Sequence, residues 1–298
     1  MIHTIDLQFR RISENIAAFL VETPIGPVLV ETGPHSTLDQ LVTGIEKAGF
    51  LADEIKHVFL THIHLDHAGA AWWFAAKGAK IYVHPRGSKH LASPERLMAS
   101  AKMIYQDMMD TLWGQMNNIA EANIIVAADQ ETFELGGQHM KAWHTPGHAV
   151  HHIAWQWGED LFTGDVAGVR IDQGLVIPPC PPPDINIADW MSSIKKIKHL
   201  QPSTLFLTHF GEVPYTEQHL DELEERLNKW ANWIKPHFLA QKTIAETTPL
   251  FQQMVKEDLM QAGISSDNQA KYEAANPSWM SVAGLFRYWK KQSVSDLQ

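Results

Sequence analysis

The sequence is poor in cysteine, since Cys180 is the only one in 298 residues. An intramolecular disulfide is therefore excluded, and so is a zinc site built from several thiolates. Basic residues are also scarce, because 24 Lys and Arg stand against 34 Asp and Glu, which gives a formal net charge of −10. This deficit counts against nucleic acid or an anionic membrane as the main partner.

Long apolar runs are missing as well. No stretch reaches the roughly 18 apolar residues that a membrane-spanning helix needs. The first 15 residues lack the basic segment and apolar stretch of a secretory signal. We therefore expect a cytoplasmic protein with a small-molecule substrate, no nucleic-acid partner and no membrane partner. The sequence does not indicate an oligomeric state.

Segments with strand character occur in two groups, one before residue 87 and one after residue 122. The first group is Ile16–Val21, Val28–Val30, Ile55–Leu60 and Ile81–His84, and the second is Ile124–Val126, Thr132–Leu135, His139–His144, His151–Trp157, Leu161–Thr163 and Leu205–Thr208. Helical spacing of apolar residues follows Ser36 and covers Ala70–Lys77 and Ala188–Leu200. This alternation predicts a layered α/β (α+β) fold with two β-rich halves.

Two regions carry helical patterns only. Residues 87–122 contain apolar residues, many of them methionines, at the spacing of helix faces. The same spacing recurs from Glu217 to the C-terminus. We therefore predict a core domain over residues 1–212 with a helical insertion at 87–122, and a helical C-terminal extension over residues 213–298.

A proline-rich run, Pro178-Pro179-Cys180-Pro181-Pro182-Pro183, lies between the last two predicted strands. Proline has no backbone N–H and cannot occupy the interior of a helix or a central strand. We expect this run to be a stiff polyproline connector on the surface.

Histidine is abundant, with 17 residues against 5 tyrosines. Four potential metal ligands fall within six residues directly after a predicted strand: His62, His64, Asp66 and His67. His62 and His64 project to one side of an extended segment, because side chains alternate along it. Asp66 and His67 follow where the chain turns into a helix, so they can face a second position nearby. Imidazole and carboxylate ligands suit zinc, iron and manganese.

Three further loops each place one potential ligand at the end of a predicted strand. They are Thr145-Pro146-Gly147-His148, Phe162-Thr163-Gly164-Asp165 and Leu207-Thr208-His209-Phe210-Gly211. Each contains a glycine that permits a sharp turn. Seven ligands from four loops are enough for two metal ions. Of the nearby His84, His144, His151 and His152, we expect at most one to orient a ligand.

The segments THIHLDH, TPGH, FTGD and LTHFG resemble, in this order, the motifs of the metallo-β-lactamase superfamily, and within it the glyoxalase-II-like branch. The resemblance implies an αββα sandwich, in which two mixed β-sheets lie face to face with helices outside. It also implies that His62, His64 and His148 bind one metal, that Asp66, His67 and His209 bind the other, and that Asp165 bridges them.

Two positions depart from the usual pattern of that family. Glu31 stands where the family usually has an aspartate that supports the site, and we expect Glu31 to take this supporting role. Gly168 stands where the lactonases of the family carry a tyrosine, three residues after the bridging Asp165.

The predicted function is metal-dependent hydrolysis. A water that bridges two divalent ions, zinc first with iron or manganese as alternatives, is a hydroxide near neutral pH and can attack the carbonyl of an ester, thioester or lactone. Asp66 and Asp165 are the predicted catalytic carboxylates, and Asp66 is placed to pass a proton to the leaving group. Tyr215 is a candidate for polarising the substrate. The insertion is expected to overhang the metals, with Tyr105 and Trp113 as substrate contacts.

Two other functions remain open at this point. A single iron held by two histidines and one aspartate would indicate a sulfur-oxidising enzyme of the persulfide dioxygenase type. A non-catalytic, metal-stabilised binding module is the other alternative. The number of metal ions per chain separates the hydrolase from the iron enzyme, and absence of turnover would favour the binding module.

Overall fold

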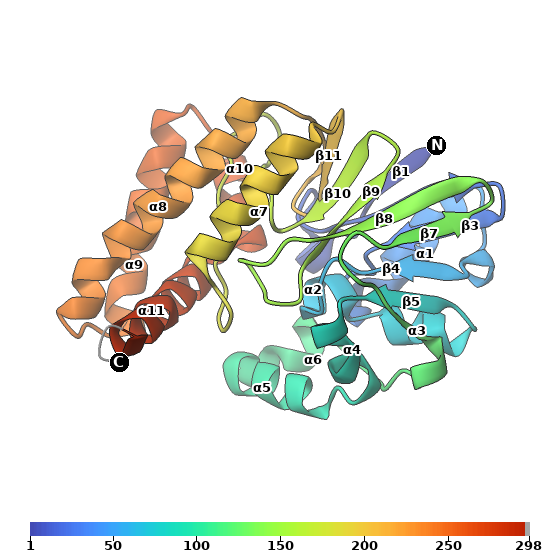
Figure 1. Cartoon of the computed structure of the whole chain (residues 1–298). Helices are drawn as coiled ribbons and strands as arrows, with labels where there is room; N and C mark the ends of the chain where they lie inside the picture. Colours follow the sequence, from blue (N-terminus) through green and yellow to red (C-terminus); the bar gives the residue numbers. More distant parts are fainter. Residues whose placement is uncertain (296–298) are drawn as a thin grey trace.

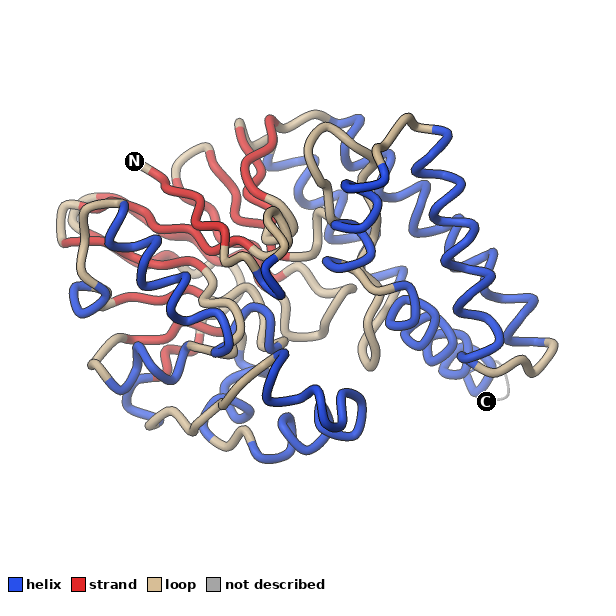
Figure 2. The backbone as a smooth tube through the Cα atoms, turned by 180° about the vertical axis from the view of Figure 1, so that it is seen from behind, coloured by secondary structure: helices blue, strands red, loops and turns tan. Residues whose placement is uncertain are grey.

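Two six-stranded sheets lie face to face in the computed structural model, which describes residues 1–295, and helices cover their outer surfaces (Figures 1 and 2). The strand order in the first sheet is β1-β2-β3-β4-β5-β6, and in the second it is β12-β11-β10-β9-β8-β7. Each sheet contains parallel and antiparallel pairs. The predicted αββα sandwich with two mixed sheets is therefore confirmed.

The strands match the sequence-based segments closely. Those of the first sheet are β1 (Ile2–Asp6), β2 (Ala17–Thr23), β3 (Gly26–Val30), β4 (His57–Phe59), β5 (Lys80–Val83) and β6 (Ile124–Val126). Those of the second are β7 (Thr132–Leu135), β8 (Gln138–His144), β9 (Ile153–Trp157), β10 (Asp160–Gly164), β11 (Thr204–Leu207) and β12 (Gly211–Pro214). Strands β1 and β12, each at an edge of its sheet, were not predicted from the sequence. Edge strands need only one apolar face and one partner, so their sequence signal is weak.

Side chains that point alternately to the two faces of each strand build the layers of the sandwich. Phe19 and Val21 of β2 pack between the sheets against Trp155 and Phe162 of the second sheet. Leu20, on the opposite face of the same strand, packs beneath the helices that cover the first sheet. This period of two is the expected consequence of the pleated backbone. It determines which residues of each strand face the other sheet and which face the helices.

The helices form two groups, one over each sheet. The first group is α1 (Leu38–Lys47), α2 (Leu65–Ala68), α3 (Ala71–Ala76), α4 (Pro85–Ala92), α5 (Glu95–Tyr105) and α6 (Met109–Leu112). The second group is α7 (Ile187–Leu200), α8 (Glu217–Leu239), α9 (Ile244–Gln261), α10 (Ser266–Ala275) and α11 (Ser278–Ser295). The region of the expected insertion is helical from Pro85 to Leu112, and residues 113–120 form no helix.

The C-terminal helices pack against α7 and the second sheet. Leu220 and Leu223 of α8 share one apolar cluster with Trp190 of α7 and Leu205 of β11. The ten residues of α10 are mostly polar and bury only Tyr272, so this helix lacks the apolar spacing of its neighbours. Within residues 1–295, every helix is too short or too polar to cross a membrane.

The proline run lies where the sequence analysis did not place it. Residues 178–181 are buried, and Pro179, Pro181, Pro182 and Pro183 line a cavity between the C-terminal helices and the rest of the chain. The expectation of a surface connector was therefore wrong. The burial depends on side chains that follow far downstream in the sequence, as described below.

Candidate metal centre

The first group of potential ligands gathers where β4 ends. His62 and His64 follow the strand, and His148 arrives from the loop after β8. Nε2 of His62 lies 2.9 Å from Nδ1 of His64, and Nε2 of His148 lies 3.1 Å from the same Nδ1 atom. One nitrogen of each of the three rings lies within 4.8 Å of the others, a spacing that suits coordination of one cation.

The second group lies beside the first. Asp66 and His67 occupy the short helix α2, and His209 follows β11. Oδ2 of Asp66 lies 3.8 Å from Nε2 of His67 and 3.6 Å from Nε2 of His209. Ligand atoms of these three side chains also lie within 4.8 Å of one another.

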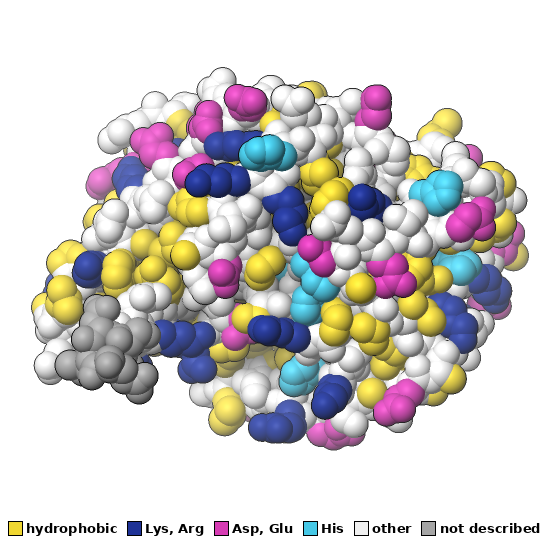
Figure 3. All heavy atoms as spheres, in the orientation of Figure 1, with side chains coloured by type: hydrophobic (Ala, Val, Ile, Leu, Met, Phe, Trp, Pro, Cys, Tyr) yellow, Lys and Arg dark blue, Asp and Glu magenta, His cyan; other side chains and the backbone are white. Residues whose placement is uncertain are grey.

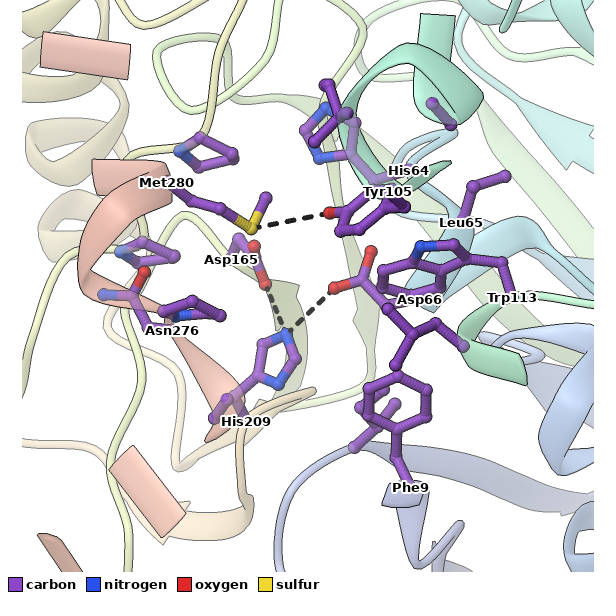
Figure 4. Close-up of a pocket in the computed structure, with 18 of the residues that line it drawn as sticks. Phe9, His64, Leu65, Asp66, Tyr105, Trp113, Asp165, His209, Asn276 and Met280 are labelled. Carbon is purple, nitrogen blue, oxygen red and sulfur yellow. Dashed lines mark hydrogen bonds and ion pairs between the residues drawn. The ribbon is translucent and has the colours of Figure 1, made fainter. Parts of the chain in front are cut away.

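Asp165 lies between the two groups and faces both. Its Oδ2 atom lies 3.3 Å from Nε2 of His148 in the first group. Its Oδ1 atom lies 3.4 Å from Nε2 of His67 and 3.5 Å from Nε2 of His209 in the second. Figure 4 shows Asp165, Asp66 and His209 converging on one space. The carboxylate thus presents one oxygen to each group.

The outward nitrogens of three of these histidines are held by the protein. Nδ1 of His67 donates to Glu31 at 2.9 Å, Nδ1 of His148 to the carbonyl of Pro179 at 2.9 Å, and Nδ1 of His209 to the carbonyl of Asn15 at 2.6 Å. A proton fixed on Nδ1 leaves the Nε2 lone pair free for a cation. The rings are therefore orientated before any metal binds.

One further histidine supports the site. His152 is fully buried, and its Nε2 accepts a hydrogen bond from the backbone N–H of Asp165 at 3.3 Å. Its Nδ1 lies 2.8 Å from Oγ1 of Thr145. His152 therefore steadies the loop that carries Asp165, and it is one of the four histidines from which at most one was expected to act on a ligand.

Burial and mutual charge shift the pKa values of the cluster. Burial, reinforced by neighbouring histidines, lowers the pKa of His62 far below its usual range and that of His64 to about 3. Burial alone would raise the pKa of Asp66, but His67 and His209 outweigh it and hold the value at about 2. The cluster therefore favours neutral imidazoles in the first group and an ionised carboxylate in the second, which are the forms that bind cations.

Two buried atoms in this cluster have no hydrogen-bond partner among the described residues, namely Nε2 of His67 and Oδ1 of Asp165. Unpartnered buried polar atoms are costly and rare in native proteins. Both atoms face the space between the two groups. A cation there would satisfy both, so the residues present fit a metal centre.

A cavity of about 300 Å³ opens onto Asp66, Asp165 and His209. Tyr105 of α5 and Trp113 line it, and Tyr105 approaches Met280 across it, with Oη 3.5 Å from the thioether sulfur (Figure 4). The space-filling view in the orientation of Figure 1 shows histidine side chains at the surface near the middle of the molecule (Figure 3). Tyr215 does not line this cavity, so the structure does not bring the expected polarising tyrosine to the site.

The sequence analysis missed the opposite wall of the cavity. Trp279 and Met280, from the start of α11, lie across from Tyr105, and Phe9 stacks on Trp113 with ring centroids 5.3 Å apart. The rings of Tyr105 and Trp279 meet edge to face at 6.0 Å. No local motif marks these residues, because they reach the site only through tertiary packing.

The layered fold and the histidine- and aspartate-lined centre at its strand ends define a class of metal-binding αββα proteins. The model of the metallo-beta-lactamase superfamily matches residues 14–209. The chain therefore belongs to the metallo-β-lactamase superfamily, whose fold implies metal binding and whose members are largely hydrolases.

Individual relatives agree with this assignment. A metallo-beta-lactamase fold-containing protein of Sulfurisphaera tokodaii is 33% identical over 177 residues, which cover 57% of this chain and 67% of that one. The crystal structure of this same archaeal protein superposes with a TM-score of 0.64 at 26% identity, over 77% of this chain and 85% of that one.

Two more distant relatives have names that describe a reaction. An atrochrysone carboxyl ACP thioesterase of Aspergillus fumigatus is 24% identical over 212 residues, which cover 67% of this chain. The match spans only 41% of that fungal protein. A probable polyketide biosynthesis zinc-dependent hydrolase of Bacillus subtilis is 23% identical over 180 residues, or 60% of this chain and 65% of that one.

Proposed function

We propose that this protein is a metal-dependent hydrolase that holds two divalent ions and cleaves an ester, thioester or lactone. The observation that carries the proposal is the position of Asp165, which presents one carboxylate oxygen to each of two ligand groups. A hydrolase named as zinc-dependent among the relatives favours zinc, with iron and manganese as alternatives.

In this proposal each of the two groups of ligands holds one metal ion. His62, His64 and His148 would hold one ion, Asp66, His67 and His209 the other, and Asp165 would be shared. Each ion would then have three ligands of its own beside the shared carboxylate, and an ion that accepts a fifth ligand could still bind water. When bound, the ions polarise the substrate carbonyl and lower the pKa of water, so that water can attack near neutral pH.

The carboxylate of Asp66 is the residue best placed to move a proton. Its side chain is 24% exposed and faces the cavity, whereas Asp165 is almost fully enclosed. During hydrolysis the oxygen of water bonds to the acyl carbon, and the bond from that carbon to the leaving oxygen or sulfur breaks. Asp66 takes the proton that water releases and returns it to the leaving atom.

Tyr105 supplies a hydrogen-bond donor from the other side. Burial, together with the nearby charge of Asp66, raises the pKa of Tyr105, so its hydroxyl stays protonated. Its present acceptor is the thioether of Met280, which is a weak one. A carbonyl or leaving-group oxygen of a substrate is a better acceptor, and its binding would replace that contact.

The cavity walls favour an apolar acyl group. Away from the ligands they consist mainly of aromatic, aliphatic and proline side chains, with Arg10 as the one Lys or Arg among the described lining residues. A volume of about 300 Å³ lies at the small end of the usual range for small-molecule sites. A thioesterase among the relatives supports a thioester as the first substrate to try.

A single-iron, sulfur-oxidising enzyme needs only two histidines and one aspartate. The seven donors of this chain, arranged in two groups around a shared carboxylate, favour two ions and hydrolysis instead.

The direct experiment measures hydrolysis of a panel of acyl esters, acyl thioesters and lactones by zinc-loaded protein, with the Asp165→Asn variant as the control. We expect turnover of at least one apolar ester or thioester by the wild type and a loss of about 100-fold or more in the variant. Oxygen uptake with a persulfide, together with no hydrolysis across the panel, would overturn the proposal.

A further inference from the structure

Residues 175–183, which we call the proline strap, pass between the metal centre and the C-terminal helices. Five of these nine residues are prolines and therefore lack a backbone N–H. The strap can accept hydrogen bonds but can donate few, and the β-bridge between Ile177 and Val169 pairs just one of its nine residues. Because residues 176–181 are buried, their carbonyl groups need donors from elsewhere.

The C-terminal helices supply those donors. Side chains of α8, α10, α11 and the α10–α11 turn donate to strap carbonyls: Arg226 to Val176, Tyr272 to Leu175 at 2.7 Å, Asn276 to Pro178 at 3.2 Å, and both Arg287 and Lys291 to Pro183 at 3.1 and 2.8 Å. The strap is thus held along most of its length by residues that lie 50 to 108 positions after their partners in the sequence.

Two strap carbonyls have partners outside the C-terminal segment, and that of Ile177 accepts from the backbone N–H of Val169 at 2.8 Å. The oxygen of Pro179 accepts the hydrogen bond from Nδ1 of His148 at 2.9 Å. His148 is fully buried, and its ring also meets the edge of Trp190 with centroids 5.7 Å apart. The Pro179 carbonyl therefore determines which nitrogen of His148 carries the proton and where Nε2 points.

Two contacts fix the strap directly beside Pro179. Asn276 is 6% exposed, and its Oδ1 atom accepts from Oγ of Ser281 at 3.1 Å, which turns its Nδ2 toward the carbonyl of Pro178. On α11, Gly284 lies so close to the strap that a Cβ atom there would collide with the carbonyl oxygen of Cys180. Pro179 is therefore clamped on both sides by the C-terminal segment.

We propose that the C-terminal helices act through the proline strap to hold His148 in its metal-binding orientation, with Asn276 as the main positioning residue. The inference rests on the assignment of His148 as a ligand in the proposed function. It gives the helical extension a role in the metal centre, beyond covering the second sheet. Loss of the Asn276–Pro178 bond lets the Pro179 carbonyl move, and the ring of His148 then loses its fixed orientation.

The test measures zinc affinity by chelator competition in the full-length Asn276→Asp, Asn276→Ala and Gly284→Ala variants. We expect the dissociation constant of one of the two ions to rise about 10- to 100-fold, the usual cost of removing support from a ligating histidine. The other ion should change by less than about threefold. The cobalt-substituted variants should also show an altered visible spectrum, because one ligand is displaced.

Ser278→Ala is the matched control. Ser278 is buried at the start of α11, two residues after Asn276, but its hydroxyl donates to Glu273 at 2.6 Å and not to the strap. We expect Ser278→Ala to lose about as much thermal stability as the Asn276 variants but to keep the zinc affinity of the wild type. If Gly284→Ala does not fold, the zinc affinities of the two Asn276 variants serve as the test.

Wild-type zinc affinity at both positions in folded Asn276→Asp and Asn276→Ala would overturn the inference. Because the measurement does not depend on turnover, it separates the two proposals. A protein that shows the affinity loss but hydrolyses nothing would retain this inference and lose the proposed reaction.

Discussion

Glu31 accepts a hydrogen bond from Nδ1 of His67 at 2.9 Å, and both side chains are fully buried. The same carboxylate accepts from the hydroxyl and backbone N–H of Thr61 and from the hydroxyl of Thr208 at 3.3 Å. Thr61 and Thr208 directly precede His62 and His209, so one side chain steadies two of the four loops that carry ligands. The additional methylene of Glu31, compared with an aspartate, still lets its carboxylate reach all of these donors.

Glu31→Gln should therefore weaken metal binding. The variant replaces a buried carboxylate by an amide that accepts more weakly and places an N–H₂ group toward other donors. We expect a loss of about 10- to 100-fold in zinc affinity, measured by chelator competition. Glu22→Gln is the matched control, because Glu22 makes a similar bond with His3 at 2.7 Å on the surface. Equal zinc affinities in Glu31→Gln and wild type would contradict this role.

Tyr105 and Trp113 should affect substrate binding and leave the metals in place. Trp113→Ala removes a wall of the cavity that stacks on Phe9, and Tyr105→Phe removes only the hydroxyl. We expect Trp113→Ala to raise KM for an apolar thioester several-fold, and Tyr105→Phe to lower kcat/KM about 10-fold. Trp143→Ala, on β8 outside the cavity, is the control. A loss of metal from either cavity variant would show that these residues support the centre instead.

His219 should make stability depend on pH. Burial lowers its pKa to about 4, and its Nε2 donates to the carbonyl of Ala167 at 2.9 Å in the neutral form. The unfolded chain takes up this proton near the usual pKa of about 6.5, whereas the folded chain does so only near 4. This contribution to stability is complete above pH 6.5 and is lost as the pH falls from 6.5 to 4.

The measurement compares metal-free wild type with His219→Gln by chemical denaturation between pH 7.5 and 4. The difference in unfolding free energy between the two proteins should shrink by up to about 3 kcal/mol as the pH falls. A difference that stays constant over this range would show that His219 is not buried as a neutral ring.

The candidate ligands could be identified from the sequence because each lies in a short motif at the end of a strand. His62, His64, Asp66 and His67 are adjacent in the chain, and His148, Asp165 and His209 each stand beside a turn glycine. Strand ends meet at one edge of a sheet, so local patterns were enough to bring them together.

The walls and supports of the site could not be predicted in the same way. The proline strap reads as a connector because its local chemistry excludes helix and strand, and its burial depends on donors such as Asn276, which lies about 100 residues further on. Trp279 and Met280 reach the cavity only because α11 packs beside the strap. Tyr215 was chosen for its distance along the chain from His209, and β12 instead carries it away from the cavity.

The number of metal ions per chain tests the central claim most directly. Elemental analysis of protein purified without chelator and then equilibrated with zinc should find close to two ions per chain, because the seven donors form two groups joined by Asp165. A value close to one that does not rise with added zinc, iron or manganese would contradict the two-metal centre and the hydrolytic function built on it.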